Sequence, residues 1–267
     1  MIELAPHHKI GLPLNNPVMI ASGCGGYGNA YQRLVDLAAF GAVVTNPITL
    51  RPRRGPAQPR LAETKAGFIL KTGQQNPGVR KVIQQYRHVW SRLDMPVIAH
   101  LPADEPDDLR RTARALTGTD TIAAIELDLP PDAVPGEIER WIWAVGEGCQ
   151  LPLLVKLPLT GAVDMAEAVA ATAADALVIA APPIGAVNSP QHGEMVSGHL
   201  YGPALHSLVL ASVQVIRNLV DLPLVAVGGI HDLADAQTFL QAGATAVQVD
   251  TLLFIDPQGA NYVAAAY

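Results

Sequence analysis

Short apolar runs alternate with longer segments of helical periodicity along the whole chain. Eight of the runs are apolar throughout, which is typical of parallel strands buried on both faces. They begin near Val18, Ala42, Val97, Ile122, Leu153, Ala176, Leu224 and Ala246. Between them, apolar residues recur every three to four positions, as on one face of an amphipathic helix. The helical segments are residues 31–40, 79–93, 107–116, 135–148, 164–173, 203–219 and 233–242.

This alternation predicts an α/β fold in which residues 1–267 form a single (β/α)8 barrel domain. Residues 1–17 predict an N-terminal β-hairpin, with strands at 2–4 and 9–10, that plugs the bottom of the barrel. After the eighth strand only residues 257–267 remain, so we expect a truncated last helix. The outer face of that strand must then be covered by this tail, by another protomer or by a partner subunit.

Two gaps between strands are longer than one βα unit, after Thr45 and after Ile179. Both follow the C-terminal end of a strand, and barrel enzymes build their active sites at that end. We therefore expect these two insertions to shape a site over the mouth of the barrel.

The composition narrows the classes of partner. Hydrophobic residues make up 49% of the chain and charged residues 16%, which indicates a large buried interior. The net charge of −6, without a basic cluster, argues against nucleic acid or an anionic membrane as a partner. No apolar run reaches the roughly 18 residues of a membrane span. Two cysteines, Cys24 and Cys149, make no disulfide framework, and we expect a cytoplasmic protein.

The stretch of residues 222–257 carries the clearest chemical signal. Gly228 and Gly229 lie between the seventh strand and a helix, so uncovered amide groups stand beside a helix N-terminus. Such turns after the last two strands of a barrel are suited to bind a phosphate group. The alternative is a tight βα turn without a ligand.

Several strings of this sequence resemble the class 1 dihydroorotate dehydrogenases in register and order. They are LNNPVMIASGCGGYG, GAVVTNPITLRPRRGPAQPRLAETKAGF, GQQNPGV, VKLPL, YGPAL, VAVGGI, AGATAVQV and FIDP. The resemblance implies a barrel that carries FMN across its C-terminal mouth, with the phosphate on the last two βα turns. The residues that it implies for FMN binding are Ala21, Ser22, Gly23, Lys156, Gly202, Gly228, Gly229 and Thr251. On the substrate side it implies Asn76, with Lys71 as a further candidate.

The sequence departs from this family at the polar positions that bind orotate. The replacements there are Asn46 and Pro47 for a lysine, Leu70 and His100 for asparagines, and Ala181 and Pro182 for an Asn-Thr pair. At the position that the resemblance places beside the phosphate, Asp250 stands for a glycine. The fourth strand, which carries the catalytic base in the family, continues as ELDLPPD without serine or cysteine. A pocket without these hydrogen-bonding groups binds a carboxylated pyrimidine more weakly, by several kcal/mol of binding free energy.

Asp128 and His100 are the remaining candidates for a catalytic base, because both stand at the C-terminal ends of strands. In the long loop after the sixth strand, His192, Glu194 and His199 have an irregular spacing, and we predict no metal site from them.

Asp250 bears on whether FMN binds at all. Val247 and Val249 share one face of the last strand, so Asp250 belongs to the other face. It points either into the phosphate site or toward a helix N-terminus. A carboxylate and a phosphate charge 4 Å apart repel by about 4 kcal/mol at an effective dielectric constant near 20.

Three functions are compatible with these features. The first is a divergent FMN-dependent oxidoreductase that acts on a C–C bond of a small cyclic substrate other than orotate. The second is a non-catalytic, flavin-free paralogue that serves as a binding or scaffold subunit. The third is a barrel enzyme that uses a phosphorylated substrate without flavin. The barrel resemblance also implies association, by default as a homodimer and otherwise with a partner subunit.

Overall fold

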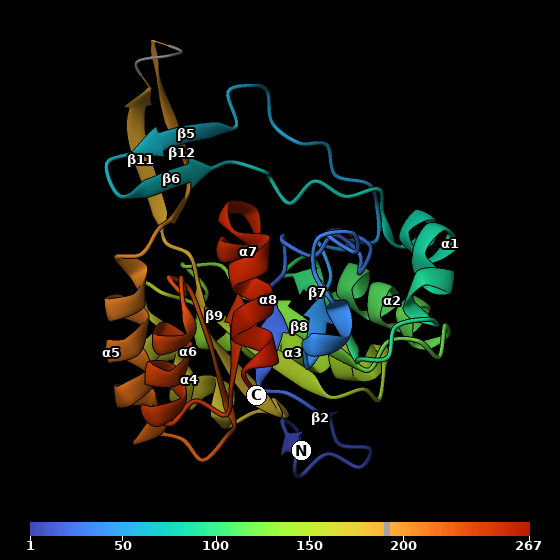
Figure 1. The fold of residues 1–267 in the computed structure, drawn as a ribbon. Helices are drawn as coiled ribbons and strands as arrows, with labels where there is room; N and C mark the ends of the chain where they lie inside the picture. Colours follow the sequence, from blue (N-terminus) through green and yellow to red (C-terminus); the bar gives the residue numbers. More distant parts are fainter. Residues whose placement is uncertain (190–192) are drawn as a thin grey trace.

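The computed structural model describes residues 1–189 and 193–267. Its centre is a closed barrel of eight parallel strands, which confirms the predicted fold class (Figure 1). The strands are β3 (Val18–Ile20), β4 (Ala42–Val44), β7 (Val97–Pro102), β8 (Ala124–Asp128), β9 (Leu153–Pro158), β10 (Ala176–Ala181), β13 (Leu224–Val227) and β14 (Ala246–Val249). Seven of them begin at the predicted residue, and β8 begins at Ala124 rather than Ile122.

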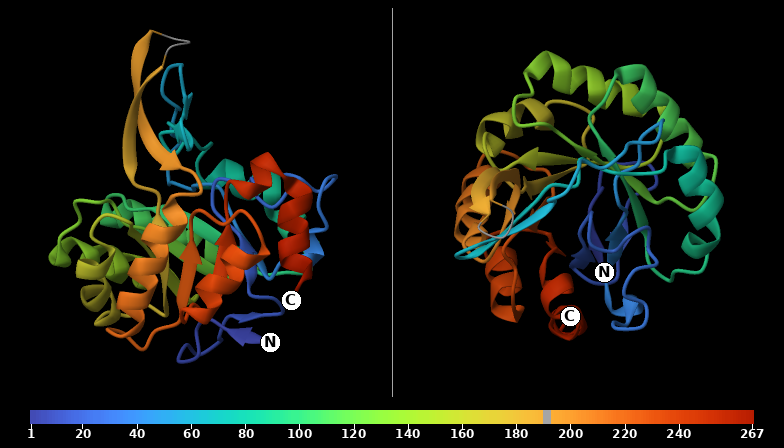
Figure 2. Two further views of the ribbon diagram at one scale, coloured as in Figure 1. Left: turned by 60° about the vertical axis from the view of Figure 1, so that its left-hand side comes forward. Right: turned by 90° about the horizontal axis from the view of Figure 1, so that it is seen from above.

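Helices surround the barrel, as the view from above in Figure 2 shows. They are α1 (Val79–Trp90), α2 (Pro106–Thr117), α3 (Pro135–Gly148), α4 (Ala162–Ala170), α5 (Leu205–Arg217), α6 (Leu233–Gln241), α7 (Leu252–Ile255) and α8 (Pro257–Ala265). Six of the seven predicted helices are confirmed. Apolar side chains fill both the layer between strands and helices and the barrel interior. No helix in the described residues is long and apolar enough to span a bilayer.

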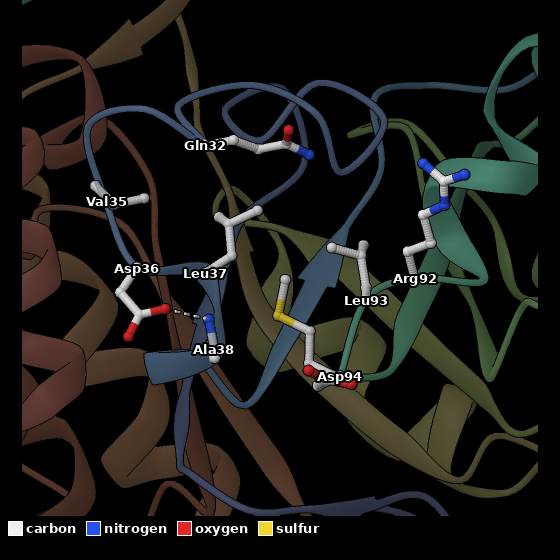
Figure 3. A pocket seen from close by; sticks show the side chains of 9 residues that line it. Gln32, Val35, Asp36, Leu37, Ala38, Arg92, Leu93 and Asp94 are labelled. Carbon is white, nitrogen blue, oxygen red and sulfur yellow. Dashed lines mark hydrogen bonds between the residues drawn. The ribbon is translucent and has the colours of Figure 1, made fainter.

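The prediction of a helix over residues 31–40 is wrong. Only a 3-10 turn, η1 (Leu37–Ala39), forms there, and Tyr31 has a φ of 63°, outside the α-helical range. The Asp36 carboxylate accepts the N–H of Ala38 at 3.0 Å and stabilises the turn (Figure 3). The irregular segment borders a side pocket of about 360 Å³, which shares no residue with the cavity described below.

The last helix is short but present. α8 has nine residues, as many as α4 and α6. The Asp256 carboxylate caps it by accepting the N–H of Gly259 at 3.0 Å, and Asn16 Nδ2 donates to the carbonyl of Ala264 at 2.7 Å. Because α8 packs against β3 and α6, the tail itself covers this side of the barrel.

The N-terminal hairpin is formed by β1 (Ile2–Glu3) and β2 (Pro13–Leu14). Its second strand does not lie at residues 9–10, as predicted, because that segment belongs to the connecting turn, where Gly11 has a φ of 66°. The Glu3 carboxylate accepts the N–H of Ala5 at 2.8 Å within this turn. The hairpin residues in the apolar cluster of the barrel interior are Leu4, Ala5, Leu12 and Leu14. The hairpin therefore plugs one end of the barrel, as expected.

The two long insertions pair with each other. The first forms β5 (Leu61–Thr64) and β6 (Gly67–Leu70), and the second forms β11 (Ile184–Ser189) and β12 (Glu194–Tyr201). β6 and β12 are antiparallel neighbours, with Leu70 opposite His199. The resulting four-stranded sheet, called the arm below, projects above the barrel (Figure 1).

Candidate functional site

A cavity of about 910 Å³ lies between the arm and the C-terminal ends of the barrel strands. Small-molecule sites usually measure about 300–1,000 Å³. The predicted site residues that line the cavity are Ala21, Ser22, Gly23, Asn76, His100, Asp128 and Lys156. Those that do not line it are Lys71, Gly202, Gly228, Gly229 and Thr251. The structure thus brings together the residues expected beside a flavin ring and one of the two substrate candidates, Asn76, whereas Lys71 and the four residues expected near the phosphate do not line this cavity.

A buried polar network lies beneath the cavity, with Glu126 at its centre. Glu126 is fully buried, and its Oε1 lies 2.9 Å from His100 Nδ1 and 3.4 Å from Lys156 Nζ. Its Oε2 accepts a hydrogen bond from Gln248 Nε2 at 2.6 Å. Burial raises the pKa of Glu126, but the Lys156 charge and the bonds from His100 and Gln248 outweigh it and hold the pKa at about 2. The ionised carboxylate therefore fixes both cavity-lining groups in place.

Glu126 and Gln248 were not predicted as parts of the site. Each is a polar residue inside an otherwise apolar strand, and a polar side chain in such a position needs a buried partner. This was the signal available in the sequence. It did not indicate the partner, because β8 and β14 are not neighbours in the barrel.

His100 and Asp128 lie together at the cavity floor, where a catalytic base was predicted. His100 Nε2 lies 3.7 Å from Asp128 Oδ2, while His100 Nδ1 faces Glu126. Asp128 Oδ1 is buried and has no hydrogen-bond partner among the described residues. Burial raises the pKa of Asp128, although His100 and Lys156 act in the opposite direction. The pair can therefore hold or move a proton beside a ligand.

The loop after β3 carries only small side chains at Ala21, Ser22 and Gly23, where it lines the cavity. Ser22 Oγ donates to the carbonyl of Thr45 at 2.8 Å, which ties this loop to the end of β4. Gly23 has a φ of 86°, and a Cβ at this position would meet no atom within 4 Å. Because Ala21 and Gly23 carry no large side chain, a flat ring has room to lie against this loop.

Asn76 lines the cavity, but its amide is engaged within its own segment. Its Oδ1 accepts the N–H of Gly78 at 2.9 Å, and its Nδ2 donates to the carbonyl of Gln74 at 3.0 Å. It also bonds to Thr49 Oγ1. These contacts show that Asn76 orders the chain before α1. Its role as a substrate ligand stays a prediction.

The turn after β13 carries unpaired backbone amides. Gly228, Gly229 and Ile230 are buried, and their N–H groups have no acceptor within residues 1–189 and 193–267. Gly229 has a φ of 74°, and a Cβ there would lie 2.3 Å from the backbone N of His206, near the start of α5. Buried amides beside a helix N-terminus suit an anion such as a phosphate.

Asp250 lies on the neighbouring strand, at the end of β14. Its side chain lines the cavity, is 5% exposed and, among the described residues, bonds only to Thr251, whose Oγ1 is 3.3 Å away. Burial raises the pKa of Asp250, while Thr251, Lys156 and His231 lower it. Asp250 therefore borders the cavity and directly precedes Thr251, the N-cap of α7 (Leu252–Ile255). Its orientation toward a phosphate site stays a prediction, because Gly228, Gly229 and Thr251 do not line this cavity.

The walls of the cavity are apolar where the family resemblance implied orotate-binding groups. Leu70, Ala181 and Pro182 line these walls. His199 of β12 also lines the cavity, and its Nδ1 lies 3.0 Å from the carbonyl of Pro182. In the part of the chain that the structure describes, no group of three His, Cys, Asp or Glu residues could hold a metal ion. His192 lies outside the described residues.

Known proteins match the chain over nearly its full length. The family described as dihydroorotate dehydrogenase matches residues 7–265. The catalytic subunit of dihydroorotate dehydrogenase B (NAD+) from Desulforudis audaxviator is 35% identical, over 96% of this chain and 88% of the relative. Subunits with the same description are 34% identical in Citrifermentans bemidjiense, over 95% and 88%, and 32% identical in Malacoplasma penetrans, over 93% and 88%.

Proposed function

The chain belongs to the dihydroorotate dehydrogenase family, and from this membership we propose that it is an FMN-dependent oxidoreductase acting on a C–C bond of a small ring-shaped substrate. The observation that carries the proposal is the cavity floor, where Lys156 lies beside the His100–Asp128 pair. A flavin reaction of this kind uses a cation near the flavin ring and a group that moves a proton.

The cavity fits the ring system of a flavin. Ala21, Ser22 and Gly23 would lie along the ring, because their loop leaves space for a flat group. Lys156 Nζ lies 3.4 Å from both Glu126 Oε1 and Gln248 Oε1, so its position is fixed. In that position it can hold negative charge on the reduced ring. When bound, FMN supplies a ring that accepts or donates a hydride.

The phosphate of FMN would bind at the turns after β13 and β14. The unpaired amides of Gly228 and Gly229 are the donors that support this assignment. The roles of Gly202 and Thr251 near the phosphate remain part of the proposal. Asp250 opposes the binding of an anion here when it is ionised, and its raised pKa reduces that opposition.

His100 is the proposed base. Donation from Nδ1 to the Glu126 carboxylate leaves Nε2 free to take a proton from the substrate, and Glu126 stabilises the imidazolium that forms. Asp128 can then accept or return that proton, since its Oδ2 is 3.7 Å from Nε2. In the reverse direction the same groups deliver a proton to the substrate.

Orotate is not the proposed substrate, because Leu70, Ala181 and Pro182 offer no side-chain hydrogen bond to a ring carboxylate. We expect dihydroorotate oxidation by the purified, FMN-loaded protein to be far slower than in the family. A robust, flavin-dependent production of orotate would refute this assignment of substrate.

The visible absorption spectrum tests the flavin itself. The protein is purified, incubated with FMN, desalted and scanned, and the expected result is a bound flavin that dithionite bleaches. Lys156→Met serves as the matched variant, because it removes the cation beside the ring and is expected to make reduction of the bound flavin harder. A protein that retains no FMN under any condition would contradict the proposed cofactor.

A second candidate function is a flavin-free binding subunit, and Asp250 is the observation that favours it. Its buried carboxyl group lines the cavity next to Thr251, beside the turns proposed to bind the phosphate. A colourless protein that copurifies with an enzyme and changes its activity would support this candidate over the first.

The relatives are catalytic subunits, which supports a further proposal, that this chain works with a second subunit. A homodimer is the alternative. Sedimentation of the purified chain, alone and after coexpression with its genomic neighbours, distinguishes the two. A monomer in both experiments would contradict both.

A further inference from the structure

Three arginines of the first long insertion line the more exposed end of the cavity, called its mouth below, and the function proposed above does not use them. Arg53, Arg54 and Arg60 all line the cavity. Because the protein as a whole has a net charge of −6, three cations at one opening are a local feature rather than a consequence of composition.

Arg60 is held in a fixed position at this mouth. Its Nε donates to the carbonyl of Pro56 at 2.7 Å, and its Nη1 donates to Gln75 Oε1 at 2.8 Å. Gly55 makes room for the pair, since a Cβ there would lie 2.3 Å from Gln75 Oε1 and 2.9 Å from Arg60 Cζ. The Arg60 guanidinium is therefore oriented by neutral oxygens, which leave its charge uncompensated.

The three arginines differ in how their charges are balanced. Arg53 Nη2 lies 2.9 Å from Asp104 Oδ2, which neutralises it. Within the described residues, no carboxylate lies within 4.0 Å of Arg54 or Arg60. The mouth thus carries about two positive charges that no protein group compensates.

The floor of the same cavity has the opposite character. Lys156 is compensated by Glu126, while the carboxyl groups of Asp128 and Asp250 both line the cavity. When Asp128 and Asp250 are ionised, an anionic group of the substrate is disfavoured beside them and favoured near the mouth, where the guanidinium groups are.

We propose that the substrate is a ring compound with an anionic group on a flexible extension, and that Arg54 and Arg60 bind this group at the cavity mouth. The proposal rests on the proposed function, in which the reacting ring lies at the floor beside His100. Guanidinium groups bind phosphate esters and carboxylates alike, often with two parallel hydrogen bonds. A ring that bears its carboxylate directly, as orotate does, would instead bring the charge close to Asp128.

Three uridine compounds test this, because they share one ring and differ only in the extension. They are uridine 5′-monophosphate, uridine-5′-carboxylic acid and uridine, titrated calorimetrically into the FMN-saturated protein. At least one anionic compound is expected to bind at least tenfold more tightly than uridine, and its advantage should shrink as NaCl screens the charges. The tighter of the two anions identifies the chemistry that the mouth prefers.

Substitutions then locate the charge. Arg54 lines the cavity but makes no side-chain hydrogen bond or ion pair in the described residues, so Arg54→Ala should fold normally. This variant should bind the anionic compound about fivefold more weakly than the wild type does. Arg54→Glu should lower the affinity for the anionic compound further, and neither variant should change the affinity for uridine. Arg51→Ala is the matched control, because Arg51 is exposed in the same loop but does not line the cavity.

Three results would overturn the proposal: equal affinities for uridine and both anions, no binding of either anion, or equal effects of Arg51→Ala and Arg54→Ala. Failure of the proposed cofactor is distinguishable, because it appears as a protein without FMN absorbance. The comparison of Arg54→Ala with Arg51→Ala can then be repeated in the flavin-free protein.

Discussion

Two buried carboxyl groups, one beneath the cavity and one lining it, differ in how their charges are compensated. Glu126, inside β8, contacts a lysine, a histidine and an amide, and its pKa is held at about 2. Asp250, at the end of β14, bonds only to Thr251 among the described residues, and burial raises its pKa. Burial therefore does not decide by itself whether a carboxyl group is ionised, because the pKa also depends on the group's charged and hydrogen-bonding partners.

The same contrast separates two parts of the site. Around Glu126 the charges are paired within the protein, so the floor is organised before a ligand arrives. Around Asp250, the amides of Gly228 and Gly229 and the carboxyl group itself are not fully paired in the described chain. This second part therefore depends on a ligand or a proton to complete it.

Removing the cation from the floor has the largest expected effect. Lys156→Met leaves Glu126 buried without its main compensating charge, which should lower the free energy of unfolding by about 3–5 kcal/mol. Urea denaturation at pH 7 measures the loss. The double variant Lys156→Met/Glu126→Gln should recover part of it, because the unpaired charge is gone. If the single variant is as stable as the wild type, the floor does not depend on this pair.

Acid should destabilise the floor next. The pKa of Glu126 is about 2 in the folded protein against an ordinary value of 4.5. Because the pKa of Glu126 is lower in the folded than in the unfolded protein, its ionised form raises the free energy of unfolding above pH 4.5. This contribution is lost as the pH falls from about 4.5 to 2 and the carboxylate is protonated. Its size is about 3 kcal/mol. Chemical denaturation across this range should show a smaller acid dependence for Glu126→Gln, and identical profiles would contradict the assignment.

At the turns, replacing Asp250 should improve FMN binding. Asp250→Gly removes a negative charge from the side of the cavity where the phosphate is proposed to bind, and the expected gain is about 2–3 kcal/mol, or a factor of about 100 in affinity. The affinity of the wild type for FMN should also rise as the pH falls, because protonation neutralises Asp250. The affinity of the variant should not show this rise. Titration of FMN into both proteins measures this. Equal affinities would show that Asp250 has no influence on the cofactor.

The smallest effect is expected at the only side-chain-to-side-chain hydrogen bond of Asp250 in the described chain. Thr251→Val keeps the shape of the side chain but removes its hydroxyl group, which should cost about 1 kcal/mol of unfolding free energy at neutral pH. In the Asp250→Gly background the same substitution should cost less, because its partner is absent. The same cost in both backgrounds would mean that the two side chains are not coupled.

The barrel could be predicted from the sequence because its strands are buried on both faces. Runs such as Leu224–Val227 and Ala246–Val249 are apolar throughout, and this local property needs no knowledge of neighbouring strands. Residues 31–40 were predicted wrongly because Tyr31, Leu34, Val35 and Ala38 recur at helical intervals. The two residues of this segment that are buried, Val35 and Phe40, are five positions apart and do not share a helical face. There, tertiary packing buries these two side chains on an irregular backbone.

The sequence by itself determined the alternation of strands and helices, the family resemblance and the cavity positions of His100, Asp128 and Lys156. These follow from local patterns and from the rule that parallel strands end at one face of a barrel. Only the tertiary structure decided that Glu126 meets Gln248, that the two insertions form one arm, and that Asp250 faces the cavity. Each of these depends on barrel closure, because closure brings side chains from distant strands into contact and sets the direction in which each one points.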